Sequence, residues 1–413
     1  MERKKVIIIG GGFGGLTAAK SIKSNEFEII LIDKTNHHLF QPLLYQVATA
    51  ALSPADIAIP IRSIFAKQQN ITVLMDEVIS IDKNEKSVHL KNFKLTFDYL
   101  IVAAGSRHSY FQHSDWEKNA PGLKTLSDAL TIREKIINSL ESAEKESDPI
   151  LKQSFLTFVV VGGGPTGVEL AGAIAEIAKK TMIRDYKNFK AYDTNVIIIE
   201  SFPRILNSFS KPLSEKALND LRKMGVRVKL NSIVENVNDD YVYLSDGTII
   251  QTKNIIWAAG NAVSPLIKTL DIQTDKTGRA IVEADCSITD NENIFVIGDA
   301  CLIYDQNGNQ LPAIAPAAIQ QGKFVGNIIS KEIPKKQRAK FHYVDKGNIA
   351  TIGKAKAVAE IKGFSFYGLP AWLLWSVIHI MYLISFRNRF RVMAEWIWYY
   401  FTNRQGTRLI VGK

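Results

Sequence analysis

The sequence predicts an α/β fold of two similar doubly wound domains, the second inserted in the first, followed by a C-terminal segment of amphipathic helices. Three observations lead to this prediction: a glycine-rich motif that occurs twice, a second motif repeated at almost the same displacement, and a basic, aromatic tail. The chain has 413 residues, 46% of them hydrophobic and 22% charged. Because domains typically have about 100–200 residues, we expect two or three of them. This much apolar material excludes a disordered chain.

The first repeat is a β-branched run that ends in glycines. Residues 6–15 read VIIIGGGFGG, and residues 158–167, which lie 152 positions later, read FVVVGGGPTG. Each copy holds G-x-G-x-x-G before a helix-like stretch, which is typical of a Rossmann-like dinucleotide site. Glycine lets the backbone approach the pyrophosphate, and the helix start supplies free N–H groups. The predicted cofactor-binding glycines are Gly10, Gly12, Gly14 and Gly15 in the first copy and Gly162, Gly164 and Gly167 in the second.

Each glycine motif is followed by an acidic residue at the end of the next apolar run. Asp33 lies 18 residues after Gly15, and Glu200 lies 33 residues after Gly167. A carboxylate there accepts hydrogen bonds from the ribose hydroxyls and repels a 2′-phosphate, which favours NAD(H) over NADP(H). The alternative is that both are ordinary acids at strand ends, and Arg204 weakens the charge argument at Glu200.

The second repeat supports two homologous domains. Residues 99–106 (YLIVAAGS) recur as residues 255–261 (IIWAAGN), 155 positions later, and Gly105 in the first copy is a further predicted cofactor contact. Two such domains predict two dinucleotides in one chain. The expected domains are a first nucleotide domain of residues 1–120 and 263–333, a second of residues 121–262, and a C-terminal domain of residues 334–413.

The tail differs from the rest of the chain in charge and in aromatic content. Residues 334–413 contain 14 Lys/Arg against 3 Asp/Glu, and the chain as a whole has a net charge of +10. Four of the six tryptophans also lie there. Such an apolar tail fits poorly with a nucleic-acid surface, whereas Trp and Tyr mixed with Arg are typical of a membrane interface.

Two apolar stretches of the tail are expected to be helices. Residues 369–386 carry no formal charge, residues 390–402 are rich in aromatics, and Arg387, Arg389 and Arg391 lie around the junction. We expect helices in one leaflet with the arginines on lipid headgroups, because a span needs about 20 residues. One true span and a buried dimer interface remain alternatives. An extended pair of strands is expected within residues 340–361.

Cysteine usage and the N-terminus limit the chemistry and the compartment. Cys286 and Cys301 are the only cysteines, and no metal-type Cys/His spacing occurs, so we expect no dithiol centre and no metal. The apolar run of residues 6–9, which follows the charged residues 2–5, is too short for an export signal. We therefore expect the protein on the cytoplasmic face of the inner membrane if it is bacterial.

Further motifs resemble a known family. Residues 293–300 (NIFVIGDA) resemble the flavoprotein reductases with two dinucleotide folds. The stretches 39–54, 312–322 and 372–410 are similar to type II NADH dehydrogenases, and this resemblance covers nearly the whole chain. It implies an enzyme that does not pump protons, in which a hydride passes from NADH to non-covalent FAD and two electrons then reach a membrane quinone, ubiquinone or menaquinone.

The resemblance also implies roles for individual residues. The first glycine motif, Asp33, Asp299 and Thr49 match FAD positions, so the resemblance implies that residues 1–120 and 263–333 bind FAD. The second glycine motif and Glu200 match NADH positions, which implies that residues 121–262 bind NADH and that residues 334–413 anchor the protein to the membrane. Glu169 matches a glutamate near the nicotinamide and flavin that is linked to proton movement. A carboxyl in a partly dry cleft would have a raised pKa and could pass on a proton. The alternative is a first-turn glutamate that the helix dipole stabilises.

The quinone motif departs from the family pattern. The family commonly shows A-Q-x-A-x-Q, but Pro316 stands here in place of the first glutamine. We expect Gln320 or backbone groups to hold the quinone head and tail residues to line a tunnel. Ser385 stands where relatives often have glycine. The remaining candidates are Gln321, Leu43 and Leu44 at the quinone, and His37, His38 and His379 in structural or minor tunnel roles.

Two other functions stay open from the sequence. One is an NADH reductase of a soluble acceptor whose tail only dimerises. The other is a flavin- and NADH-binding redox sensor without turnover. Homodimerisation through the tail is an expectation from the resemblance.

Overall fold

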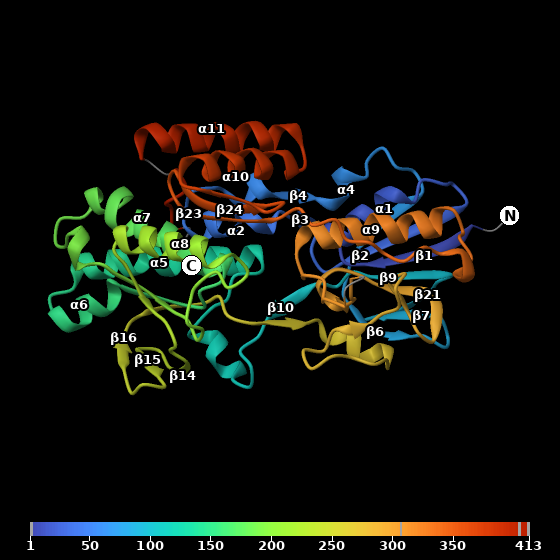
Figure 1. The fold of residues 1–413 in the computed structure, drawn as a ribbon, viewed down its shortest axis with the longest axis horizontal. Helices are drawn as coiled ribbons and strands as arrows, with labels where there is room; N and C mark the ends of the chain where they lie inside the picture. The colour runs from blue at the N-terminus through green and yellow to red at the C-terminus, as the bar shows by residue number, and fades with distance from the viewer. Residues whose placement is uncertain (1–2, 306–307, 404–405, 411–413) are drawn as a thin grey trace. The chain divides into compact units, whose positions relative to one another are not determined.

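A computed structural model describes residues 3–305, 308–403 and 406–410 (Figure 1). The predicted first domain includes residues 1–2 and 306–307, and the predicted anchor includes residues 404–405 and 411–413; these lie outside the described residues. The chain folds into two compact units. The first comprises residues 1–39, 59–107 and 261–345, and the second comprises residues 40–58, 108–260 and 346–413.

The first unit is built on a six-stranded sheet with the order β20-β21-β9-β1-β2-β5. Its central strands are parallel. They are buried because each contains a run of Ile, Val and Leu. Helices α1 and α9 pack against each other in this unit. The strands are β1 (Lys4–Ile9), β2 (Phe27–Asp33), β5 (Ile71–Met75), β9 (Tyr99–Val102), β20 (Ser287–Ile288) and β21 (Asn291–Val296), and the helices are α1 (Phe13–Ser21), α4 (Ile61–Ile64) and α9 (Ala315–Ser330).

Smaller elements complete the first unit. A three-stranded antiparallel sheet joins β6 (Val78–Asp82), β7 (Ser87–Leu90) and β8 (Lys94–Thr96). Cys286 and Cys301 are buried free thiols. The short strands and turns are β3 (His37–Leu39), β4 (Ala58–Pro60), β10 (Ser106–His108), β18 (Asn261–Val263), β19 (Ala280–Ile281), β22 (Cys301–Leu302), η6 (Pro265–Leu270), η7 (Gly298–Ala300) and η8 (Lys335–Gln337).

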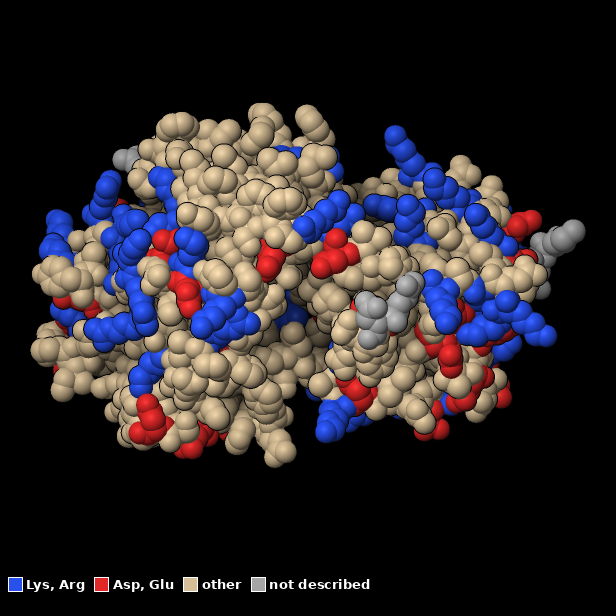
Figure 2. All heavy atoms as spheres, in the orientation of Figure 1, with Lys and Arg blue, Asp and Glu red and all other residues tan. Residues whose placement is uncertain are grey.

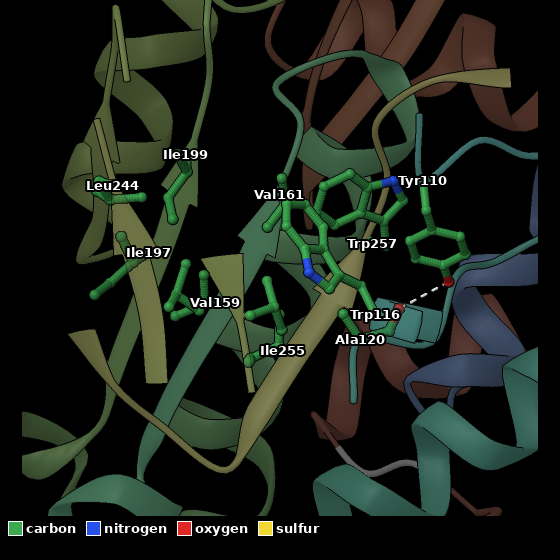
Figure 3. Close-up of a cluster of buried hydrophobic side chains, with 12 residues drawn as sticks. Tyr110, Trp116, Ala120, Val159, Val161, Ile197, Ile199, Leu244, Ile255 and Trp257 are labelled. Carbon is green, nitrogen blue, oxygen red and sulfur yellow. Dashed lines mark hydrogen bonds between the residues drawn. The ribbon is translucent and has the colours of Figure 1, made fainter. Parts of the chain in front are cut away.

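The second unit repeats the architecture around a four-stranded parallel sheet with the order β13-β12-β11-β17. Figure 3 shows its core, in which the strand residues meet Trp257, Trp116 and Tyr110. The hydroxyl of Tyr110 donates to the carbonyl of Ala120 at 2.8 Å. The elements are α5 (Leu126–Lys145), α6 (Pro149–Phe155), β11 (Thr157–Val161), α7 (Pro165–Glu176), η3 (Ile177–Thr181), η4 (Ile183–Asp185), η5 (Ala191–Asp193), β12 (Asn195–Ile199), α8 (Lys211–Lys223), β13 (Val226–Lys229), β14 (Val234–Val237), β15 (Tyr241–Leu244), β16 (Ile249–Gln251) and β17 (Asn254–Trp257), after η2 (Ser114–Lys118).

The C-terminal part of the chain belongs to the second unit. Helix α7 packs closely on β23, the first strand of this part. A Cβ at Gly172 would lie 1.8 Å from the carbonyl oxygen of Ile352. The predicted extended pair is confirmed as an antiparallel hairpin, to which the structure adds a third strand. The elements are β23 (Asn348–Gly353), β24 (Lys356–Ile361), β25 (Phe364–Tyr367), α10 (Leu369–Tyr382) and α11 (Phe386–Thr402), together with η1 (Gln41–Leu43), α2 (Leu44–Ala48) and α3 (Pro54–Ile57) from the early chain.

These observations confirm the predicted fold. The chain leaves the first unit after Arg107 and returns to it at Asn261, so the second nucleotide-type sheet is inserted in the first. The described residues contain no helix that is both long and apolar enough to cross a membrane. The division into three separate domains at the predicted boundaries stays a prediction.

Figure 2 shows a broad uncharged surface over α10 and α11. Large apolar side chains are exposed on both helices: Val377 and Met381 on α10 are 60% and 61% exposed, and Phe386 and Phe401 on α11 are 83% and 77% exposed. A patch of this kind is unusual on a soluble monomer and marks an interaction surface.

Candidate active site

The first glycine loop, in the first unit, has the geometry of a phosphate cradle. Gly10 has φ +102°, and a Cβ at Gly15 would lie 1.9 Å from the carbonyl oxygen of Gly10, so both positions require glycine. At Gly12, which precedes α1, a Cβ would meet nothing within 4 Å. No side chain caps this helix start, and the first N–H groups of a helix have no acceptor within the helix itself. The loop therefore fits an anionic group such as a pyrophosphate.

The second glycine loop, in the second unit, repeats this geometry. Gly162 has φ +109°, and a Cβ at Gly167 would lie 1.9 Å from the carbonyl oxygen of Gly162. Gly164 again borders open space, at the uncapped start of α7. The chain thus holds one cradle in each unit.

The two predicted carboxylates have equivalent places beside the two loops. Asp33 accepts from the backbone N–H of Gly11 at 2.6 Å, and Glu200 accepts from that of Gly163 at 2.6 Å. Each also accepts two bonds from the turn that follows its strand. A carboxylate has about four acceptor sites, so each retains capacity for a ribose hydroxyl.

The other predicted flavin contacts of the first unit lie where β9 and β21 end. Asp299, in η7, accepts from the hydroxyl of Ser106 at 2.6 Å. Gly105 has φ +64° and borders open space. The carboxyl ends of neighbouring parallel strands are where such sheets bind ligands. Ser106 was not predicted, although its place directly after the repeated Ala-Ala-Gly motif is a signal that could have found it.

A pocket lies wholly within the second unit. It leaves about 70 Å³ of room for the centres of water-sized groups. Elements from four separate parts of the chain line it: α2, α7, the turn after β23, and helices α10 and α11. The lining residues are Tyr45, Gln46, Thr49, Ala51, Glu169, Ala173, Glu176, Thr351, Gly353, Lys354, Trp372, Trp375, Glu395, Trp396, Tyr399 and Tyr400.

Glu169 is the acid of this pocket with the most strongly altered ionisation. It is the fifth residue of α7, beyond the first turn, so the alternative of a first-turn glutamate held by the helix dipole does not apply. The side chain of Glu169 as a whole is half-buried, because part of it faces the pocket. Its carboxyl group is surrounded by protein. Desolvation raises its pKa from 4.5 to about 8, and a long 3.4 Å bond from the N–H of Thr351 opposes this only weakly.

An aromatic wall faces the pocket from the two C-terminal helices. The ring centroids of Trp375 and Trp396 are 4.9 Å apart. The indole N–H of Trp396 donates to Gln46 at 2.8 Å, and Gln46 donates in turn to the hydroxyl of Tyr45 at 2.8 Å. Trp375 is 1% exposed, yet its indole N–H has no hydrogen-bond partner among the described residues. A buried donor without a partner is costly, so this N–H calls for an explanation.

Comparison with known proteins agrees with this geometry. The model of the pyridine nucleotide-disulphide oxidoreductase family matches residues 4–322, and that of the NDH2 C-terminal domain matches residues 346–405. Two type II NADH:quinone oxidoreductases of Mycobacterium tuberculosis are 38% and 40% identical to this chain, over 98% and 95% of it and 90% and 86% of their own lengths.

The chain belongs to the type II NADH:quinone oxidoreductases. A solved structure of NDH2 from Plasmodium falciparum in complex with NADH superposes with a TM-score of 0.91, over 97% of this chain and 99% of that one. At 22% identity this match shows the fold alone. FAD is the cofactor of the family, and the two cradles described above fit two dinucleotides.

The residues that were predicted for the quinone of this type II enzyme are engaged in other contacts. Gln320 uses both ends of its amide on the backbone of Val344, donating at 3.0 Å and accepting at 2.9 Å. Gln321 is 2% exposed and accepts from the N–H of Gly298 at 2.7 Å, which is a structural contact. Pro316 lies in the first turn of α9, where proline is favourable because no helical N–H bond is lost.

Of the early-loop candidates, Thr49 alone reaches the pocket among the described residues. Its hydroxyl donates to the carbonyl of Tyr45 at 2.8 Å. Leu43 and Leu44 are 0% and 2% exposed, and they are core residues in this structure. Thr49 belongs to the second unit, whereas the first cradle belongs to the first.

Two of the predicted minor histidines make structural hydrogen bonds. The ring of His38 bonds the carbonyl of Gly11 at 3.0 Å, and that of His379 bonds the carbonyl of Trp375 at 2.7 Å. Burial lowers the pKa of both rings. Neutral rings at these places fit the structural role.

Proposed function

We propose a division of the reaction among the residues described above. The chain is a flavin-dependent NADH:quinone oxidoreductase of the type II family, which does not pump protons. When bound, FAD supplies the hydride acceptor for NADH and the electron donor for the quinone. The first cradle, with Asp33, Gly105 and Asp299, holds FAD. The second, with Glu200, holds NADH.

The pocket of the second unit takes the quinone ring, and this is the assignment that the geometry supports best. Its aromatic wall offers flat apolar contacts for a ring. The unpartnered N–H of Trp375 is a donor for a quinone carbonyl. Glu169, whose pKa of about 8 keeps it protonated near neutral pH, supplies a proton to the reduced quinone. The observation that carries the assignment is this pairing of a protonated acid with an unused buried donor in one pocket.

The exposed apolar faces of α10 and α11 rest on lipid in this proposal, and the members of this family are membrane-associated. Each helix is too short to cross a bilayer: the 14 residues of α10 extend roughly 21 Å, against a hydrocarbon core of about 30 Å. We infer a peripheral attachment on the cytoplasmic face. Not all the predicted headgroup arginines point to lipid, however. Arg389 donates to the carbonyl of Leu383 at 2.8 Å, and Arg391 pairs with Asp56 at 3.4 Å.

Narrowing the pocket tests the quinone assignment. Ala173 lies on α7 at the pocket, so Ala173→Leu places a larger side chain there while keeping a good helix former. We expect reoxidation of the reduced enzyme by a short-chain quinone to slow by about tenfold or more, which corresponds to roughly 1.4 kcal/mol. Flavin reduction by NADH stays unchanged, and Ala173→Ser is the matched control. Equal reoxidation in both variants would show that the quinone binds elsewhere.

A further inference from the structure

A second carboxyl of the pocket, Glu176, has no part in the scheme above. It is the last residue of α7 and is 8% exposed. One carboxyl oxygen accepts from the backbone N–H of Lys354 at 2.6 Å, and the other accepts from the hydroxyl of Tyr399 at 2.9 Å. A buried carboxyl held by two donors is prepared to carry a negative charge for part of the time.

Glu176 lies on the same face of α7 as Glu169. The two residues are seven positions apart, which is two helical turns or roughly 10 Å along the axis. Both line the pocket, but they are too far apart for a direct hydrogen bond. A water needs about 10–15 Å³ of such room, so a pocket of 70 Å³ has room for several waters while no quinone occupies it.

The groups around Glu176 come from every element packed against it. Lys180 on η3 and Lys354 after β23 favour its ionised form, as does the bond from Tyr399. Desolvation is the larger effect, and it raises the pKa of Glu176. Tyr45 on α2 also feels the charge of this carboxyl, and Glu395 on α11 lines the same pocket. Glu176 therefore keeps its proton to a higher pH than an ordinary surface glutamate does.

The backbone beside Glu176 is irregular, and its partner reaches the surface. The π-helical segment Ile177–Thr181 follows directly, and the hydroxyl of Thr181 donates to the carbonyl of Glu176 at 3.1 Å. Single π-helical turns are often found at functional sites. Tyr399 is partly exposed. The bond between Tyr399 and Glu176 thus joins a partly exposed residue of α11 to the inside of the pocket.

We propose that Glu176 and Tyr399 form a proton relay that returns a proton from bulk water to Glu169 through waters of the pocket while no quinone occupies it. Reduction of a quinone to a quinol takes two electrons and two protons. The hydride of NADH supplies both electrons and one proton by way of the flavin, and the relay supplies the second proton from water. In each passage Glu176 gives its proton to a pocket water and is left as a carboxylate held by Lys354 and Tyr399. It then regains a proton from solvent. The inference rests on the proposed function. Glu176 acts on the quinone only through Glu169.

The test separates the two half-reactions of the full-length holoenzyme in detergent. Stopped-flow absorbance follows flavin reduction by NADH and reoxidation by ubiquinone-1 between pH 6 and 9. We expect Glu176→Gln to slow reoxidation by about tenfold or more, to remove one ionisation from its pH profile, and to leave flavin reduction unchanged. Glu176→Asp restores much of the rate, because a carboxyl returns. Tyr399→Phe removes a donor to the carboxylate, so we expect its profile to shift to higher pH.

Other results would overturn the relay. A Glu176→Gln enzyme with the wild-type reoxidation rate and pH profile has no need of the carboxyl. Equal slowing of both half-reactions, without restoration by Glu176→Asp, would show a structural role only. The Ala173→Leu variant distinguishes this failure from that of the quinone assignment. If Ala173→Leu impairs reoxidation and Glu176→Gln does not, the relay alone is wrong; if neither impairs it, the pocket is not the quinone site.

Discussion

Replacing Gly164 by alanine tests the assignment of the second cradle to NADH. Gly164 has φ −70° and ψ −179°, which any residue adopts, and an added Cβ would meet nothing within 4 Å. Alanine is a poorer helix N-cap than glycine by about 0.5–1 kcal/mol, but it lowers the entropy of the unfolded chain by a similar amount. The fold should therefore be unaffected to within about 1 kcal/mol.

Binding of NADH should suffer, because the methyl group occupies the space beside the N–H groups that a pyrophosphate approaches. Loss of one charge-assisted hydrogen bond costs roughly 1.5–3 kcal/mol. We therefore expect NADH affinity to fall about 10- to 100-fold, measured from the NADH dependence of flavin reduction. Flavin content and melting temperature remain as in the wild type.

The matched variant is Gly12→Ala in the first cradle, where the backbone is equally permissive and a Cβ again meets nothing. This variant should lose FAD and keep its fold, as measured by flavin absorbance and circular dichroism. An unchanged NADH affinity in Gly164→Ala would refute the reasoning. So would the reverse pattern, in which Gly164→Ala loses flavin and Gly12→Ala keeps it.

Two further predictions concern backbone strain and pH. Ser385 has φ +79° and ψ 129°, a region that favours glycine. Ser385→Gly should therefore stabilise the protein by about 1 kcal/mol and raise its melting temperature by roughly 2 °C, whereas Ser385→Ala should do neither. Equal melting temperatures of the two variants would contradict this. The pKa of Glu169 rises from 4.5 to about 8 on folding, so the folded state binds more protons over that range and loses stability as pH increases through it, by at most ~5 kcal/mol. Glu169→Gln removes this loss, so the melting temperature of the variant should fall less than that of the wild type between pH 5 and 8. If the melting temperatures of both proteins change equally with pH, Glu169 does not have the raised pKa of a buried acid.

The repeated motifs could be predicted from the sequence because they are local. The backbone turn at Gly10 and the acid at Asp33 lie within one strand–helix–strand unit. Gly162 and Glu200 lie within a second unit of the same kind. The structure shows the same carboxylate-to-backbone bond in both. The hairpin of β23 and β24 was predictable for a similar reason, since its strands are adjacent in the chain.

The pocket could not be predicted, because its lining comes from segments far apart in the sequence. The bond between Trp396 and Gln46 joins residues 350 positions apart, and that between Tyr399 and Glu176 joins residues 223 apart. Neither local propensity nor hydrophobic periodicity states which faces of α7 and α11 meet. The sequence instead directed attention to Gln320, whose amide is engaged by Val344.

The tail helices were predicted, but their boundary was not. Residues 369–386 form one uncharged run, yet α10 ends at Tyr382 and α11 begins at Phe386. A side chain of the second helix satisfies the end of the first. Arg389 donates to the carbonyls of Leu383 and Met381, at 2.8 Å each, and so satisfies groups that a helix end leaves open.

The assignment of this protein as a quinone reductase depends most directly on what reoxidises its reduced flavin. The measurement is stopped-flow absorbance of the detergent-purified protein, first mixed with NADH under anaerobic conditions and then with a short-chain quinone. We predict that NADH bleaches the flavin and that the quinone restores its colour, quickly in the wild type and slowly in Ala173→Leu. A flavin that NADH reduces and no quinone reoxidises would contradict the account.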